Sequence, residues 1–165
     1  MRRPRWPATA PPVSGGVEVH GHRLLAAETH LTLDVIRTVA FESGLAVHLA
    51  LTATGAPAEM AHRQTRPLTD PDDWSAEWSY LTVWATVENT DAEADPYLPR
   101  PDVHACDAGR SVYRTEPRYW LGTPPIVRSV TLTAGWPQIG LPATTAILAL
   151  EPTDQPSIGT GVGDR

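Results

Sequence analysis

The 165-residue chain is predicted to be an all-β protein. We expect an antiparallel β-sandwich, immunoglobulin-like or jelly-roll-like, with seven or eight strands and at most one short helix. Apolar residues recur mainly at every second position, which is the period of a half-buried strand. Turn residues separate these runs at roughly 8- to 12-residue intervals. An α/β fold would need amphipathic helices of about 10 to 15 residues between its strands, and the sequence has none.

The first two predicted strands form a hairpin. Residues 28–41 (ETHLTLDVIRTVAF) place their apolar side chains mostly on one parity, and residues 45–51 resume the alternation after Ser43 and Gly44. Two alternating runs joined by a short loop that contains glycine are typical of a β-hairpin. This pair of strands is the clearest in the sequence.

Five further strands are expected downstream of this hairpin. The strand at residues 78–88 (WSYLTVWATVE) places Leu81, Val83, Ala85 and Val87 on one face. The others span residues 103–106, 111–114, 125–134 and 144–150. The single predicted helix runs from Pro57 to Gln64, with proline at the first helical position, where its missing N–H costs little.

These elements belong to one predicted domain, residues 17–151, which is long enough to bury a sizeable core. Residues 1–16 combine Arg2, Arg3 and Arg5 with several prolines, and residues 152–165 are rich in Gly, Pro, Thr and Asp. Such segments bury little apolar surface, so both are expected to be flexible tails.

Composition and charge exclude several classes of function. The formal net charge of -6 argues against nucleic-acid binding. The single Cys106 excludes an internal disulfide framework and zinc sites built on several thiolates. The absence of lysine excludes Schiff-base and P-loop chemistry. No apolar run of about 18 residues predicts a membrane span, and no apolar region of an export signal follows Arg2 and Arg3. We therefore expect a cytoplasmic protein with no membrane span and no cofactor.

The negative charge is concentrated in one segment. Residues 70–107 contain ten acidic residues and only Arg100, which gives a net charge of -9, and the remainder of the chain carries +3. A charged stretch of this kind is expected to be solvated and to keep a sheet edge from pairing with other chains.

Three short landmarks resemble a known family. They are the hairpin from Phe41 to Leu49, the segment YWLGTPP from Tyr119 to Pro125, and the turn WPQIG from Trp136 to Gly140. Together they resemble an uncharacterised family of β-sandwich proteins from high-GC actinobacteria, over residues 28–150. Residues 83–113 are more weakly similar to immunoglobulin-like domains of unknown function. Both resemblances imply a sandwich fold, and neither implies catalytic residues.

The first candidate site is an aromatic strand face formed by Trp78, Tyr80 and Trp84. These rings lie on the parity opposite to Leu81 and its apolar partners. If they are exposed, they suit sugar stacking or a protein partner, because rigid rings bind at low entropic cost. The alternative, which we favour for Trp84, is burial in a strand that is covered on both faces.

The second candidate site is a metal centre at His20, His22 and Glu28. Residues two apart on a strand share a face, so both imidazoles could bind one ion. The alternative is a pair of solvated histidines where the tail joins the domain.

The third candidate site is an arginine patch. Arg110, Arg114 and Arg118 share a strand parity and suit an anion or an acidic partner, unless they pair with the acidic segment of their own chain. Cys106 with His104 would form a reactive thiolate pair, but a buried, inert strand cysteine is the favoured interpretation.

The sequence contains no Gly-x-Ser-x-Gly elbow and no recognisable Ser, His and Asp spacing. The leading hypothesis is therefore a non-enzymatic protein-interaction or scaffold domain, with self-association as one form of it. The first alternative is a small metal-dependent enzyme or ligand-binding protein that uses His20 and His22. The second alternative is a carbohydrate-binding module that uses the aromatic strand face.

Overall fold

The computed structural model describes residues 4–65, 79–97, 102–107, 109–123 and 127–151. The predicted tail at residues 152–165 lies outside these ranges. The described residues are mostly in strands and include one α-helix, so the all-β class is confirmed. They form twelve strands, more than the seven or eight expected, because several strands are short segments without a clear apolar alternation.

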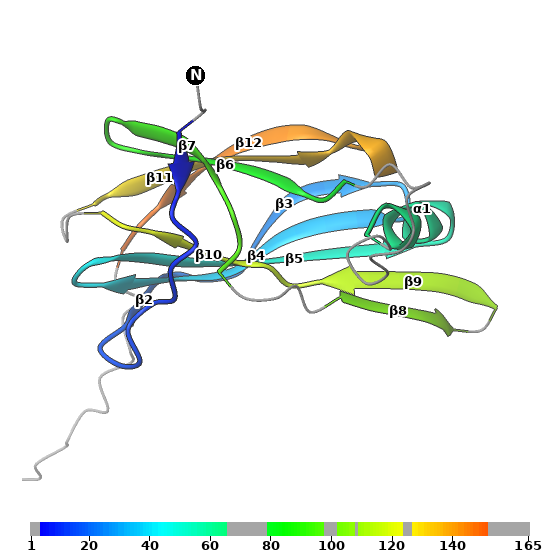
Figure 1. Ribbon diagram of the computed structural model, residues 1–165, viewed down its shortest axis with the longest axis horizontal. Coiled ribbons are helices and arrows are strands. Elements are labelled where there is room, and N and C mark those ends of the chain that lie inside the picture. Colours follow the sequence, from blue (N-terminus) through cyan, green and yellow to red (C-terminus); the bar gives the residue numbers. More distant parts are fainter. Residues whose placement is uncertain (1–3, 66–78, 98–101, 108, 124–126, 152–165) are drawn as a thin grey trace, which may run out of the picture.

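The strands form two sheets that lie in two layers (Figure 1). The strands of the five-stranded sheet lie in the order β1 (Arg5–Trp6), β7 (Thr90–Ala94), β6 (Thr82–Val87), β11 (Ser129–Trp136) and β12 (Leu141–Ala149). Five strands of the seven-stranded sheet lie in the order β2 (Val17–His20), β4 (Leu31–Phe41), β5 (Gly44–Thr54), β9 (Arg110–Thr115) and β8 (Asp102–Asp107). In that sheet β3 (Arg23–Glu28) pairs with β4, and β10 (Arg118–Leu121) pairs with β5. The pairs are antiparallel except β1 with β7.

One hydrophobic core lies between the two sheets. The seven-stranded sheet contributes alternate residues of β4 and β5, and the five-stranded sheet contributes alternate residues of β6 and β11. The core-facing positions are Leu33, Val35, Leu49, Leu51, Val83, Ala85, Val87, Val130 and Leu132. The parity predicted for residues 31–35 and 81–87 is therefore correct, since each position is the inward-facing member of its strand. The same parity is expected of Val39 and Phe41, and there it is wrong: a register shift after Val35 turns both residues to the outer face of the sheet.

The predicted helix is present as α1 (Ala56–Thr65), with Pro57 in its first turn. Its buried residues include Ala58 and Ala61, whose small side chains allow the helix to lie close to β5 and β9. The WPQIG landmark is also a local structure: Pro137–Ile139 form a short 3-10 helix, and Gly140 closes it with φ 97, a left-handed conformation that glycine adopts without strain.

Strand β5 is buried on both faces. From Leu45 to Leu51 every residue is buried, although the strand alternates between the core and the outer face of its sheet. Gly44 at its start is needed for close packing, because a Cβ there would lie 2.5 Å from the carbonyl oxygen of Leu121 on β10.

Part of the predicted N-terminal tail packs onto the domain. Arg5–Trp6 forms a parallel strand on the edge of β7, and Trp6 is only 6% exposed within the core. Its indole N–H donates to the carbonyl of Ala85 at 3.1 Å. Arg5 donates to both Asp95 (2.7 Å) and Glu93 (3.3 Å) of the acidic segment. The composition of residues 1–16 gave no indication that a single tryptophan would anchor them.

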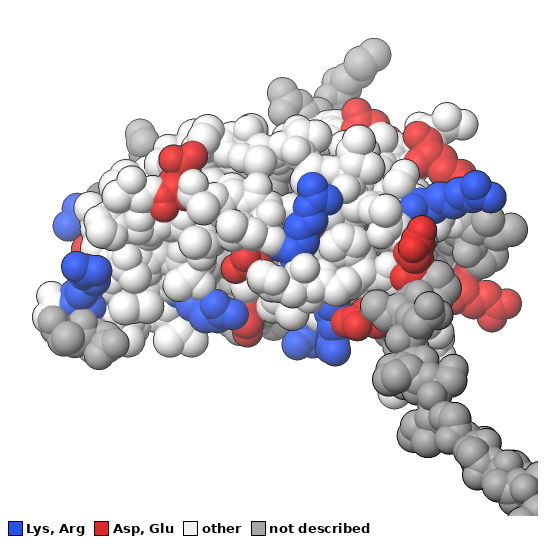
Figure 2. Space-filling model, turned by 180° about the vertical axis from the view of Figure 1, so that it is seen from behind, with Lys and Arg blue, Asp and Glu red and all other residues white. Residues whose placement is uncertain are grey.

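The face opposite to Figure 1 has charges of both signs. Arginine and acidic side chains are interspersed over it, with uncharged surface between them (Figure 2). Within the described residues, no helix is long and apolar enough to cross a membrane.

We expect Trp6→Ala to lower the free energy of unfolding by about 3 to 5 kcal/mol, because it removes a large ring from a packed core. Urea denaturation followed by far-UV circular dichroism measures this. Arg5→Gln is the control and should cost less than about 1 kcal/mol, since its ion pairs are half exposed. A Trp6→Ala variant as stable as the wild type would show that the anchor does not form in solution.

Candidate functional site

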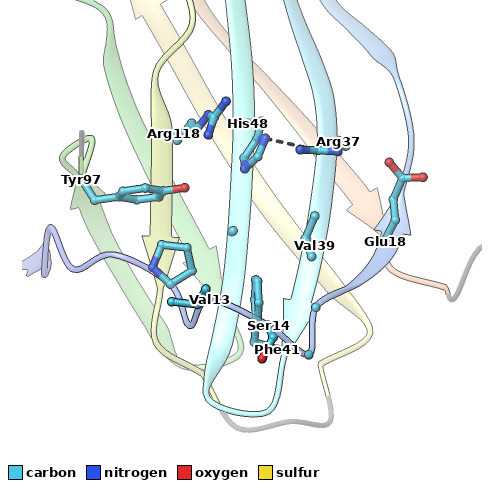
Figure 3. A pocket seen from close by; sticks show the side chains of 13 residues that line it. Val13, Ser14, Glu18, Arg37, Val39, Phe41, His48, Tyr97 and Arg118 are labelled. Carbon is cyan, nitrogen blue, oxygen red and sulfur yellow. Dashed lines mark hydrogen bonds between the residues drawn. The ribbon is translucent and has the colours of Figure 1, made fainter. Parts of the chain in front are cut away.

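The candidate site is a pocket of about 580 Å³ on the outer face of the seven-stranded sheet. Strands β4 and β5 form its floor. Residues 11–16, Glu18 on β2, Tyr97 and β10 surround it (Figure 3). We call this pocket the His48 groove, after the side chain near its centre.

Strand register builds the polar part of the His48 groove. In the seven-stranded sheet, His48 on β5 lies directly opposite Arg37 on β4 and Arg118 on β10. The three side chains therefore form one row across adjacent strands. The next row along the strands contains Val39 and Ala46, which form an apolar floor beside the polar row.

A β-bulge directs Arg37 into this row. The β4–β5 register shifts between Val35 and Arg37, so Val35 faces the core opposite Leu49, and Arg37 faces outward opposite His48. Without the bulge, regular alternation would place Arg37 on the core face with Val35, where an arginine could not be accommodated. The bulge therefore places a guanidinium on the outer face next to an imidazole.

His48 is held neutral. It is 9% exposed, and burial, followed by the charges of Arg118 and Arg37, lowers its pKa to about 4. The Arg37 Nε–H donates to His48 Nδ1 at 3.3 Å. Since Nδ1 accepts, the single ring proton is on Nε2, which makes that atom a hydrogen-bond donor.

The hydrogen-bonding groups of the His48 groove are mainly donors. The Tyr97 hydroxyl points toward His48 from the opposite wall (Figure 3). Among the described residues, no carboxylate forms an ion pair with Arg118 or Arg37. A smaller hollow of about 140 Å³ on the other side of the row shares Arg37, His48 and Arg118 and is bordered by Glu116, whose carboxylate is already bonded to Arg114 at 2.8 Å. The groove is therefore suited to a ligand that supplies negative oxygen atoms and a small apolar group.

Of the three predicted arginines, only Arg118 lines the His48 groove. Arg114 lies opposite Thr52 and bonds to it and to Glu116. Arg110 lies four residues before Arg114 on β9, so it is farther along the sheet by about 13 Å. Arg118 lies on β10, opposite His48, four residues along β5 from Thr52, so it is also separated from Arg114 by about 13 Å along the sheet.

The structure also separates the predicted aromatic face. Trp78 lies outside the described residues. Tyr80 packs against the core, with its hydroxyl 2.6 Å from Thr115 Oγ1 and its ring 5.4 Å from Trp136. Trp84 is half-buried on the outer face of β6. Tyr80 precedes β6, so strand parity does not apply to it.

His20, His22 and Glu28 have separate surroundings. His20 Nδ1 lies 2.7 Å from the carbonyl oxygen of Gly21, and His22 Nε2 lies 3.3 Å from the carboxylate of Asp34. Glu28 ends β3 opposite Leu31. In the part of the chain that the structure describes, no three His, Cys, Asp or Glu side chains are grouped to hold a metal ion.

Cys106 is exposed, so the expectation of a buried cysteine is wrong. β8, which carries it, is an edge strand of its sheet. The imidazole of His104 interacts with other residues: its Nε2 lies 2.7 Å from Ser111 Oγ and 3.7 Å from the Glu59 carboxylate. Both contacts use Nε2, whereas a catalytic triad needs its carboxylate on Nδ1.

Sequence reasoning missed Arg37, His48 and Tyr97. One signal was present: His48 is the single polar side chain in the apolar run from Leu45 to Leu51. A polar residue at such a position is buried only with a partner, but the sequence does not show which residue lies opposite.

The fold and the His48 groove together define an all-β protein of two packed sheets with a donor-rich pocket on the outer face of one sheet. Comparisons with protein-family models, curated proteins and solved structures found no match.

We expect His48 to destabilise the fold in acid. Its folded pKa lies below the ordinary value of 6.5, so the unfolded chain binds more protons between pH 6.5 and about 4. Stability is lost as pH falls through that window. At about 1.4 kcal/mol per pKa unit the loss reaches about 3 kcal/mol at pH 4. Urea unfolding of wild type and His48→Gln at pH 7, 5.5 and 4 measures it. Parallel pH profiles for the two proteins would contradict this account.

Proposed function

We propose that the protein is a non-enzymatic interaction domain of β-sandwich type, whose His48 groove binds an acidic segment of a partner protein. The observation that carries this proposal is the row Arg37–His48–Arg118, which presents two guanidiniums and one neutral imidazole donor to the same pocket. Guanidiniums bind carboxylates with two parallel hydrogen bonds, so this row favours a carboxylate ligand.

The apolar side of the groove supports a peptide over a bare ion. Val39, Phe41, Ala46 and Val13 line the pocket beside the polar row. A volume of about 580 Å³ falls in the range of ligand sites, roughly 300 to 1,000 Å³. A short peptide segment with a carboxylate next to an aliphatic side chain would match both parts of the groove.

The net charge of the chain supports a protein partner over a nucleic acid. At -6 overall, with Glu18 at the border of the groove, the domain would repel a phosphate backbone over most of its surface. A short acidic segment needs to approach only the local arginine row, where the nearby guanidiniums outweigh the distant acidic residues.

The properties of His48 support binding over catalysis. A general base is most effective when its pKa lies near the working pH, and the pKa of His48 is about 4. The Ser111–His104 pair is equally unsuited, because Ser111 is 8% exposed and the carboxylate of Glu59 lies at the same ring nitrogen as the serine.

Three finer points belong to the same proposal. The two packed sheets support a sandwich, of immunoglobulin-like or jelly-roll-like type. A cytoplasmic location and membership of the actinobacterial family that the landmarks resemble rest on the sequence alone. Fractionation of the cells that make the protein tests the location, and a structure of a member of that family tests the shared fold.

We expect the wild type to bind a fluorescein-labelled peptide of four aspartates followed by one leucine, and not a tetralysine control. Arg118→Gln and Arg37→Gln should each weaken binding by about 10- to 100-fold, the effect of losing one charge-assisted hydrogen bond of about 1.5 to 3 kcal/mol. Fluorescence anisotropy at constant salt measures the affinity.

Arg110→Gln is the matched control, because it removes the same charge outside the groove and should leave the affinity unchanged. A uniform loss in all three arginine variants would indicate non-specific attraction and would overturn the groove as the site. Absence of binding by the wild type would also contradict the proposal.

A further inference from the structure

The outer face of the five-stranded sheet carries a second surface that the His48 groove does not explain. Its outward-facing residues on β6, β11 and β12 are uncharged, and most of them are threonines. Two cross-strand rows define it: Thr86–Thr131–Ile147 and Trp84–Thr133–Thr145. We call these six residues the threonine face.

Trp84 lies along this face. Its indole N–H donates to Asp91 Oδ1, which also accepts from Thr86 Oγ1 at 2.6 Å. Asp91 is on β7, directly opposite Thr86, and is therefore the diagonal cross-strand neighbour of Trp84. The polar end of the indole therefore reaches across to β7, and the side chain of Trp84 remains partly exposed.

Two threonine hydroxyls on this face bond to each other. Thr133 Oγ1 and Thr145 Oγ1 are 2.9 Å apart and form a cross-strand hydrogen bond. Each hydroxyl can donate one bond and accept two, so both keep capacity for a ligand. The carboxylate of Glu93, at the edge of the face, is occupied by Arg5.

We propose that the threonine face binds a neutral oligosaccharide, with Trp84 as the stacking platform. A sugar ring has an apolar C–H surface that matches an exposed indole, and its hydroxyls match the donor and acceptor capacity of the threonines. β6, β11 and β12 present no charged side chain to this face. The nearest guanidiniums lie at its edges, where Arg5 pairs with Glu93 and Arg23 donates to the carbonyl of Ile147, so a ligand across the middle of the face meets only uncharged side chains. The only large apolar side chains are Trp84 and Ile147, fewer than a protein interface core needs. The proposal is independent of the His48 groove.

The test is isothermal titration calorimetry of the full chain with cellohexaose and with chitohexaose. We expect measurable binding of at least one of them. Trp84→Ala should weaken binding by at least about tenfold, and Trp84→Phe, which keeps a flat ring, should retain most of it. Thr133→Ala should give an intermediate loss. Val103→Ala, at an exposed position on β8 of the other sheet, is the control and should bind as the wild type does.

Two results would overturn the proposal. One is the absence of binding of both oligosaccharides by the wild type, or equal binding by wild type and Trp84→Ala. The other comes from sedimentation velocity: if the wild type is a dimer that Trp84→Ala dissociates, the threonine face is a contact between copies of this chain. Thermal unfolding of each variant checks that it remains folded, which is expected because Trp84 is not part of the core.

Discussion

Burial of β5 on both faces is the constraint on which the rest of the structure depends. Its inward residues Leu49 and Leu51 belong to the core, and it pairs with β4, β9 and β10. A polar group in a strand so enclosed must lose its charge or find a partner. His48 does both, because its pKa is lowered to about 4 and its Nδ1 accepts from Arg37. The chemistry of the His48 groove is thus a consequence of where β5 lies.

The N-terminal segment contacts both sheets and lines part of the His48 groove. Arg5–Trp6 is attached to the five-stranded sheet, and the chain then runs to β2 of the seven-stranded sheet, with residues 11–16 lining the groove on the way. Arg5 neutralises part of the acidic segment through Glu93 and Asp95. The uneven charge of the sequence is therefore partly balanced within the fold.

Much of the fold follows from local pattern. The alternation in residues 31–35 and 45–51, the parity of β6 and the helix after Gly55 could each be read from neighbouring residues. The short strands β1, β2 and β10 could not, because each is held by its pairing with a strand farther away in the sequence. Trp6 shows the reason: its partner, the carbonyl of Ala85, is 79 residues away. β3 and β7 pair with the strand next to them in the chain, but they are short and have no clear apolar alternation of their own.

The candidate site was less predictable than the fold. Arg37, His48 and Arg118 lie on three strands, and their meeting depends on cross-strand register and on one bulge. Neither is encoded in spacing along the chain. The arginine pattern grouped Arg118 with Arg110 and Arg114 by parity, whereas its neighbours in the His48 groove come from β4 and β5.

The most direct test of the central claim is a ¹⁵N–¹H NMR titration of the histidine rings, with and without a saturating acidic peptide. We expect the free His48 to carry its proton on Nε2 and to titrate with a pKa of about 4. We also expect a bound carboxylate to raise that pKa, because a nearby negative charge favours the imidazolium. The other five histidines should not respond to the peptide. A free His48 with an ordinary pKa, or a pKa unchanged by the peptide, would contradict the account.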